Sequence, residues 1–319
     1  MFRTLLLRTL FALFALLPFG TSFAQDHYPS KSVEVLSVFG AGGGTDILAR
    51  VYAAEMKKLT GQSFVVINRV GAAGSIGFAA LASAKPDGYT IAFAPATPLT
   101  NSPHIIKGLP YTFDSIVPAC GVFDNVFTVA VLPSSPYKTL KDLLDAARAH
   151  PGKLSYGNAG LGSIPHLSMA ALTRAAGVSM IPIAYRGDAG VIPALMSGTI
   201  TAGIVAVSSM VGRDLRVLAV FNDHRDPAYP DAPSVTELGF PRISPGLNGV
   251  FVPKGLPKPV FDMLQRTCKQ VVSTPEFLAA AKKLHQTVHY YTGPEYEKIL
   301  RADYEDKGKL IKEIGLGRK

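Results

Sequence analysis

Residues 33–50 read VEVLSVFGAGGGTDILAR, in which an apolar run gives way to five small residues and then to a helix-forming segment. We expect a strand from Val33 to Phe39 and a helix from about Thr45 to Leu59, closed by Gly61. A strand that enters a helix through a short loop is the repeating unit of α/β proteins with largely parallel sheets. Because the same unit recurs along the chain, the sequence predicts an α/β fold.

Two further loops rich in glycine and hydroxyl groups follow predicted strands. Residues 70–75 come after the predicted strand from Phe64 to Ile67, and residues 157–163 open a predicted helix from Ile164 to Ala176. In open α/β sheets, ligands bind beyond the carboxyl ends of the strands, where helix N-termini present unpaired N–H groups that favour anions. The three loops together predict a binding site for a small anion, with Thr45, Ser75, Thr97 and Ser163 as hydroxyl donors.

The alternation of strands and helices falls into two halves. We expect the chain to cross between them near Asp124 to Val131 and again near Leu247 to Pro253. The segment from Lys258 onward predicts three helices that return to the first half. The expected lobes are therefore residues 25–125 plus 249–319, and residues 126–248.

The first 24 residues have the features of a secretory signal peptide. Arg3 and Arg8 precede an apolar run from Leu10 to Leu17, and small residues at Ser22 and Ala24 suit cleavage after Ala24. The run is too short to span a bilayer, which takes roughly 20 residues. The sequence predicts a protein exported to the periplasm, soluble after cleavage.

Composition excludes several classes of protein. The chain has 319 residues, of which 48% are hydrophobic and 17% charged, so it can bury two domains' worth of core and is not disordered. The net charge of +9 favours anionic ligands, but the Lys and Arg residues are scattered and do not form a patch for nucleic acid. Cys120 and Cys268 are the only cysteines, and both a disulfide and two buried thiols are compatible with the sequence.

Three classes of enzyme fit the motifs poorly. The segment from Gly40 to Thr45 lacks the third glycine of a dinucleotide loop, and GxxxxGK[ST] is absent. The segment around Ser75, AGSIG, resembles a hydrolase nucleophile elbow, but seven residues separate Ser75 from the preceding predicted strand. His285 and His289 lack the intervening Glu of a zinc protease helix. We therefore expect neither catalysis nor a metal or other cofactor, with a Ser75 hydrolase as the weakest alternative.

A set of motifs in a fixed order spans essentially the whole mature chain. It comprises YPSK at 28–31, GGGTDILAR at 42–50, NR at 68–69, GSIG at 74–77, PDGYT at 86–90, LPY at 109–111, PGKL at 151–154, HL at 166–167, YRG at 185–187 and FVPKG at 251–255. This set resembles the periplasmic solute-binding receptors of tripartite tricarboxylate transporters, the TctC or Bug-like family. The resemblance implies a type II periplasmic-binding-protein fold, in which two α/β lobes joined by two crossing strands close on a ligand like a Venus flytrap.

The resemblance also implies a function: capture of a small organic carboxylate and its delivery, by a receptor that is mostly monomeric, to the membrane components of a transporter. A sensor that presents its closed form to a membrane signalling protein is an alternative. Carried onto this chain, the binding residues of the first lobe are Gly42, Gly43, Thr45, Asp46, Ala72, Ala73, Gly74 and Ser75. Those of the second lobe are Gly160, Ser163, His166, Tyr185, Arg186 and Gly187.

The chain departs from the family pattern at several of these positions. Many members carry Asp-Asn where this chain has Val205-Ala206, so an ammonium group would lose its counter-charge there. We therefore expect a hydroxy or achiral carboxylate, with an apolar or aromatic body, in preference to an amino acid. Arg186 is the predicted partner of a second anionic group, whereas Asp46 is expected to favour the helix N-terminus and to contact an anion only through water.

Overall fold

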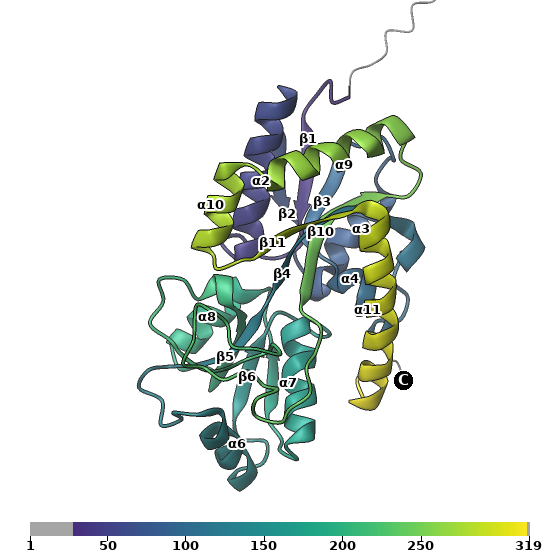
Figure 1. Ribbon diagram of the computed structural model, residues 1–319. Coiled ribbons are helices and arrows are strands. Elements are labelled where there is room, and N and C mark those ends of the chain that lie inside the picture. The colour runs from purple at the N-terminus through teal and green to yellow at the C-terminus, as the bar shows by residue number, and fades with distance from the viewer. Residues whose placement is uncertain (1–27, 318–319) are drawn as a thin grey trace, which may run out of the picture.

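The computed structural model describes residues 28–317, so the predicted signal peptide lies outside the described residues. The chain forms two α/β units, each built around its own sheet, and the two long strands β4 and β10 run between them (Figure 1). The predicted α/β fold with two lobes is confirmed. Within residues 28–317, no helix is both long and apolar enough to cross a membrane.

The first sheet has six strands and holds the N-terminal part of the chain and its C-terminal end. Strands β2 and β3 run parallel to β1, whereas β10 pairs antiparallel with β3 and β4. The strand order is β11 (Val288–Thr292), β4 (Ile116–Asn125), β10 (Gly246–Pro253), β3 (Thr90–Pro95), β1 (Val33–Ser37) and β2 (Phe64–Asn68). Its helices are α2 (Gly44–Thr60), α3 (Ser75–Ser83), α4 (Thr97–Thr100), α5 (Ser102–Ile105), α9 (Lys258–Val272), α10 (Pro275–Lys283) and α11 (Gly293–Glu313).

The second sheet has five strands, in which β6 runs parallel to β7 and β8, and β5 runs antiparallel to β8 and β9. The strand order is β7 (Ile181–Ala184), β6 (Ser155–Asn158), β8 (Ala202–Ala206), β5 (Phe127–Val131) and β9 (Arg216–Val220). Its helices are α6 (Leu140–Ala149), α7 (Ile164–Ala175) and α8 (Asp188–Met196). The 3-10 turns of the molecule are η2 (Ala72–Gly74), η3 (Phe113–Ser115) and η4 (Val207–Ser209).

The chain crosses between the units where the sequence predicted. Strand β4 continues through Val126 into β5, and β10 carries the chain back to the first sheet. The three C-terminal helices form as predicted, and α9 and α10 pack on the first sheet and α2. The lobe boundaries given above stay a proposal. A disulfide joins Cys120 of β4 to Cys268 of α9, which decides between the two alternatives that the sequence left open.

Local signals account for the helix ends. Helix α2 ends at Gly61, whose φ of 74° is a left-handed conformation that glycine adopts without a steric penalty. Helices α6 and α11 begin at Thr139 and Thr292, which form capping boxes with Asp142 and Glu295. Strand β11 was not predicted, because its segment VHYYT is only partly buried and pairs with a single strand at the sheet edge.

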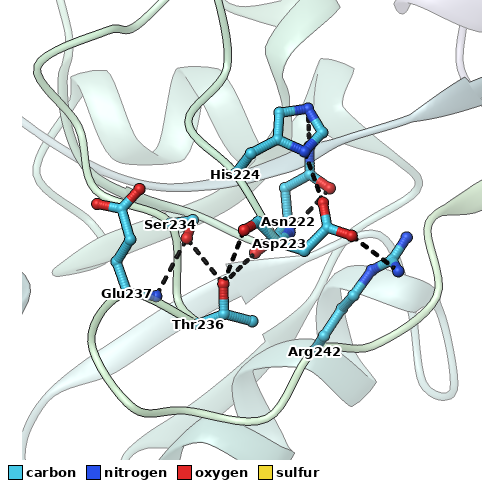
Figure 2. A network of polar contacts seen from close by, with 7 residues as sticks. All are labelled: Asn222, Asp223, His224, Ser234, Thr236, Glu237 and Arg242. Carbon is cyan, nitrogen blue, oxygen red and sulfur yellow. Dashed lines mark hydrogen bonds and ion pairs between the residues drawn. The ribbon is translucent and has the colours of Figure 1, made fainter.

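A long segment between β9 and β10, residues 221–245, contains neither a helix nor a strand. Its own side chains hold it in place through the polar network in Figure 2. The Asp223 carboxylate contacts Arg242 at 3.0 Å and His224 at 2.6 Å, and the Thr236 hydroxyl donates to the Asp223 carbonyl at 3.1 Å. The segment therefore returns the chain to β10 along a fixed path.

Candidate ligand site between the lobes

A cavity lies between the two units, at the carboxyl ends of their parallel strands. The first unit lines it with Phe39, Gly40, Gly43, Gly44, Thr45, Asp46, Pro95 and Thr97, and the crossing strands add Asn125 and Gly246. The second unit contributes Phe127, Ala159, Ser163, Ile164, Pro165, Gly187, Asp188, Ala206, Ser208 and Ser209. Loops from both sheets thus share one cavity, to which the first and the third of the three predicted loops contribute.

Contacts between the units close this cavity. The Gly40 N–H donates to the Arg186 carbonyl at 3.3 Å, and the Asn101 amide donates to the Gly162 carbonyl at 2.8 Å. A Cβ on Gly160 would lie 3.2 Å from the backbone nitrogen of Ala73. The units meet backbone to backbone, so the structure represents a closed arrangement.

The N-terminus of α2 faces the cavity without a side-chain cap. Gly43 is the N-cap, with φ −75° and ψ 160°, and no side chain accepts from the first N–H groups of the helix. The first four N–H groups of a helix have no intrahelical partner, and the helix dipole adds about half a positive charge there. The Thr45 hydroxyl donates to Asn248 Oδ1 at 3.3 Å and accepts from the Asn125 amide at 3.4 Å, so its proton is already used and the helix N–H groups are the donors at this end. This end of the cavity is suited to a carboxylate.

Asp46 organises this loop. Its carboxylate accepts from the Gly42 N–H at 3.0 Å, from Arg50 at 3.0 and 3.1 Å and from the Asn68 amide at 2.8 Å. Burial by itself would raise the pKa of Asp46, but these donors and the Arg50 charge outweigh burial and lower the pKa. Asp46 therefore stays ionised and neutralised by Arg50, and it fixes the backbone that leads into α2.

The second predicted loop approaches the other unit through its backbone. Ala72 and Ala73 have φ of 47° and 51°, a left-handed conformation that costs a residue with a Cβ roughly 1–2 kcal/mol. Ala72 and Ala73 line a cleft that adjoins the cavity, together with Gly160, Tyr185 and Arg186. The Ser75 hydroxyl is buried and donates to the Ser102 hydroxyl at 2.8 Å.

The predicted site residues thus divide into three groups. Seven line the cavity: Gly43, Thr45, Asp46, Thr97, Ser163, Gly187 and Ala206. Five line the adjoining cleft: Ala72, Ala73, Gly160, Tyr185 and Arg186. The remaining five lie outside both linings: Gly42, Gly74, Ser75, His166 and Val205.

Like Ser75, two more residues of the last group, His166 and Val205, make contacts within the protein. His166 Nδ1 accepts from the Gly162 N–H at 3.0 Å, and burial lowers the pKa of His166 to about 4, so its imidazole is neutral. The His166 N–H lies 3.4 Å from Ser163 Oγ, which caps α7 and leaves that helix end less available to a ligand. Val205 packs in the hydrophobic cluster of Val191 and Leu195.

Sequence reasoning missed thirteen of the twenty residues that line the cavity, among them all of those with an aromatic ring or an unpredicted polar side chain: Phe39, Asn125, Phe127, Asp188, Ser208 and Ser209. Asp188 begins α8, and its Oδ2 accepts from the Ala206 N–H at 2.9 Å. Burial raises the pKa of the Asp188 carboxyl, while the Ala206 N–H and the Ser209 hydroxyl oppose that effect. The position of Asp188 directly after the predicted site residues Tyr185, Arg186 and Gly187 could have indicated it. Phe39 and Phe127 lie in predicted strands, and nothing in the sequence distinguishes them from other strand residues.

Among residues 28–317, no three His, Cys, Asp or Glu side chains cluster in a way that could hold a metal ion. The arrangement of helix N–H groups, hydroxyls and apolar rings is one that binds and encloses a small molecule.

The fold is that of the two-lobed periplasmic solute-binding proteins. The solved periplasmic binding protein BugD superposes with a TM-score of 0.86 at 28% identity, covering 92% of this chain and 100% of BugD. An R. palustris protein, Rpa4515, solved with adipate, superposes with a TM-score of 0.84 at 25% identity, covering 91% of this chain and 99% of that protein.

Residues 48–316 match the tripartite tricarboxylate transporter family receptor, TctC, and the chain belongs to this family. Among curated relatives, a UPF0065 protein of Bordetella pertussis is 30% identical over 313 residues, which cover 96% of each chain. The family resemblance inferred from the motifs is therefore confirmed. The family consists of solute-binding receptors.

Proposed function

We propose that this protein captures a small organic carboxylate between its lobes in the periplasm and delivers it to the membrane components of a tripartite tricarboxylate-type transporter, without catalysis. One observation carries the proposal: the uncapped N-terminus of a 17-residue helix, α2, opens into a cavity that both lobes enclose. An enclosed helix N-terminus holds an anion through several N–H groups, and each hydrogen bond to a charged group contributes about 1.5–3 kcal/mol.

The ligand class is supported by a neighbour as well as by the cavity. The R. palustris protein with the same fold was solved with adipate, a carboxylate. The aromatic rings of Phe39 and Phe127 suit the apolar body that we expect the ligand to have. The argument against an ammonium group loses its premise, however, because the Asp188 carboxyl lies beside Ala206 and can accept a hydrogen bond from an ammonium group there.

A screen of carboxylates by thermal shift, followed by calorimetry, tests the proposal. A ligand at 100 times its Kd adds about 2.7 kcal/mol to the free energy of unfolding, which gives a clear rise in Tm. If no small carboxylate raises the Tm or gives a binding isotherm, the proposed function is wrong.

The variant Gly43→Pro tests the role of the α2 N-terminus. The Gly43 φ of −75° suits proline, and a Cβ there meets only the Gly40 carbonyl, at 3.7 Å. The variant removes one backbone N–H from the cavity. We expect carboxylate affinity to fall about 10- to 150-fold, the equivalent of one lost hydrogen bond to a charge, while the ligand-free Tm is retained. If the folded variant binds the carboxylate as tightly as the wild type does, the α2 N-terminus is not the carboxylate site.

A further inference from the structure

The second lobe also directs a helix N-terminus at the cavity, but a carboxylate of the protein already occupies it. Helix α8 has nine residues and begins after Gly187, whose φ of 102° only glycine adopts readily, and no side chain caps it. Asp188 is its first residue, lines the cavity and accepts the Ala206 N–H at 2.9 Å. A helix N-terminus stabilises a negative charge, so Asp188 sits where a second ligand carboxylate would otherwise bind.

The side of the cavity formed by the α2 N-terminus still has free donors. The Ser208 hydroxyl is buried, with 4% of the residue exposed, and has no hydrogen-bond partner among the described residues. It lines the cavity directly beside Gly44, the first residue of α2. A buried hydroxyl without a partner costs about 1–3 kcal/mol of stability, so the position of the Ser208 hydroxyl indicates that it donates to an oxygen of the bound ligand.

Positive side chains are missing from the lining. None of the described residues that line the cavity is Lys, Arg or His. Arg50 is paired with Asp46, and Arg186 lies in the adjoining cleft. No ion pair of Asp188 is found in residues 28–317. The cavity therefore has donors at the α2 end and an unpaired carboxyl at the α8 end.

From this asymmetry, and building on the proposed function, we propose that Asp188 is a specificity-determining residue. It makes the site select monocarboxylates that carry an O–H or N–H donor at their other end, and reject dicarboxylates of the same length. A donor group can hydrogen-bond to the Asp188 carboxyl beside its contact with Ala206, whereas a second carboxylate can approach it in the enclosed site only against a like charge or with the uptake of a proton. The adipate-bound neighbour holds a dicarboxylate, so this chain would differ from it in ligand.

Two series of ligands that differ only in the distal group provide the test. The six-carbon series is 6-hydroxyhexanoate, 6-aminohexanoate, hexanoate and adipate, and the four-carbon series is 4-hydroxybutyrate, 4-aminobutyrate, butyrate and succinate. In calorimetry with the full mature protein, we expect the better donor-bearing acid to bind at least tenfold more tightly than the dicarboxylate of its length. The hydroxy and amino members show which donor the site takes.

The variant Asp188→Asn removes the charge but keeps an oxygen that can accept the Ala206 N–H. In this variant we expect the ratio of the affinity for the donor-bearing acid to the affinity for the dicarboxylate of the same length to fall at least tenfold, mainly because the dicarboxylate binds more tightly. Asp46→Asn is the matched control, because it removes a carboxylate that lines the same cavity but is already neutralised by Arg50. Because this control also leaves Arg50 without its partner, it measures the general effect of removing one negative charge from the lining, and we expect it to change the preference far less than Asp188→Asn does. Thermal unfolding of both variants verifies that they fold.

The outcomes separate the inference from the function on which it rests. If the wild-type protein binds dicarboxylates as tightly as their donor-bearing counterparts, or if Asp188→Asn shifts all ligands equally, the role of Asp188 is wrong while the proposed function stands. If the wild-type protein binds no member of either series while the wider carboxylate screen finds a ligand, the inference is wrong and the proposed function stands; if that screen finds no ligand either, both fail.

Discussion

The contact between Gly44 and Ser208 makes closure of the lobes sensitive to a single methyl group. A Cβ on Gly44 would overlap the Ser208 hydroxyl and lie 2.6 Å from Ser208 Cβ, far inside van der Waals contact. Overpacking of this kind costs about 1–3 kcal/mol. Because Gly44 and Ser208 belong to different lobes and meet in the closed arrangement, we expect Gly44→Ala to weaken carboxylate binding about 5- to 150-fold.

The free lobes should tolerate the same change. Gly44 is the first residue of α2, where alanine favours the helix over glycine, so the Tm of the ligand-free protein should stay the same or rise. Calorimetry with the best carboxylate of the screen measures the loss of affinity, and small-angle scattering with ligand measures closure.

A double variant isolates the contact. Ser208→Gly removes both atoms that a Cβ on Gly44 would meet, so Gly44→Ala should cost little affinity in a Ser208→Gly background, whereas it should stay costly in a Ser208→Ala background, which keeps the Cβ. The reasoning is refuted if Gly44→Ala binds and closes like the wild type, or if Gly44→Ala costs as much affinity in the Ser208→Gly background as it does in the wild type.

Three further predictions concern stability. Because burial lowers the pKa of His166 to about 4, the unfolded chain takes up a proton at a higher pH than the folded protein does. Urea unfolding should therefore show the free energy of unfolding falling by up to about 3 kcal/mol from pH 6.5 to pH 4, and His166→Asn should reduce this pH dependence. An unchanged pH profile in the variant would contradict this. Lys307 and Asp303 form a buried ion pair at 3.1 Å. Lys307→Met should lower the free energy of unfolding by about 3–5 kcal/mol, because it leaves the Asp303 charge buried without its partner, and adding Asp303→Leu should restore part of this loss. Equal losses in the single and the double variant would exclude the ion pair as the cause. The disulfide between Cys120 and Cys268 spans 148 residues, and replacing both cysteines by Ser should lower the free energy of unfolding by up to about 5 kcal/mol, as loop entropy predicts. A reductant should destabilise the wild type to the same extent and should have no further effect on the variant.

Much of the fold could be predicted from short stretches of sequence. The loop before α2, the left-handed Gly61 after it and the capping boxes at Thr139 and Thr292 each fix a boundary from within a few residues. Strand β11 could not be predicted in this way, because VHYYT becomes a strand only through pairing with β4. Helix α8 was also missed, since Gly190 and Pro193 lie within it.

The binding loops could be predicted, but the direction of their side chains could not. Ser75 and His166 follow glycine loops and carry polar groups, yet both hydrogen-bond behind the cavity wall. Asp188, which received no attention in the sequence, lines the cavity. These outcomes depend on contacts between residues that are far apart in the chain, and no local pattern encodes them.

The amino-acid sequence alone was sufficient for the α/β class, the two crossings between lobes and the family, because each depends on local propensity or on the order of motifs. Only the tertiary structure decided that Cys120 and Cys268 are bonded, that Gly44 faces Ser208, and that Asp188 rather than Arg186 enters the cavity. The physical reason is that a site between two lobes is made where their surfaces meet, and the shape of that meeting is set by packing across the whole molecule.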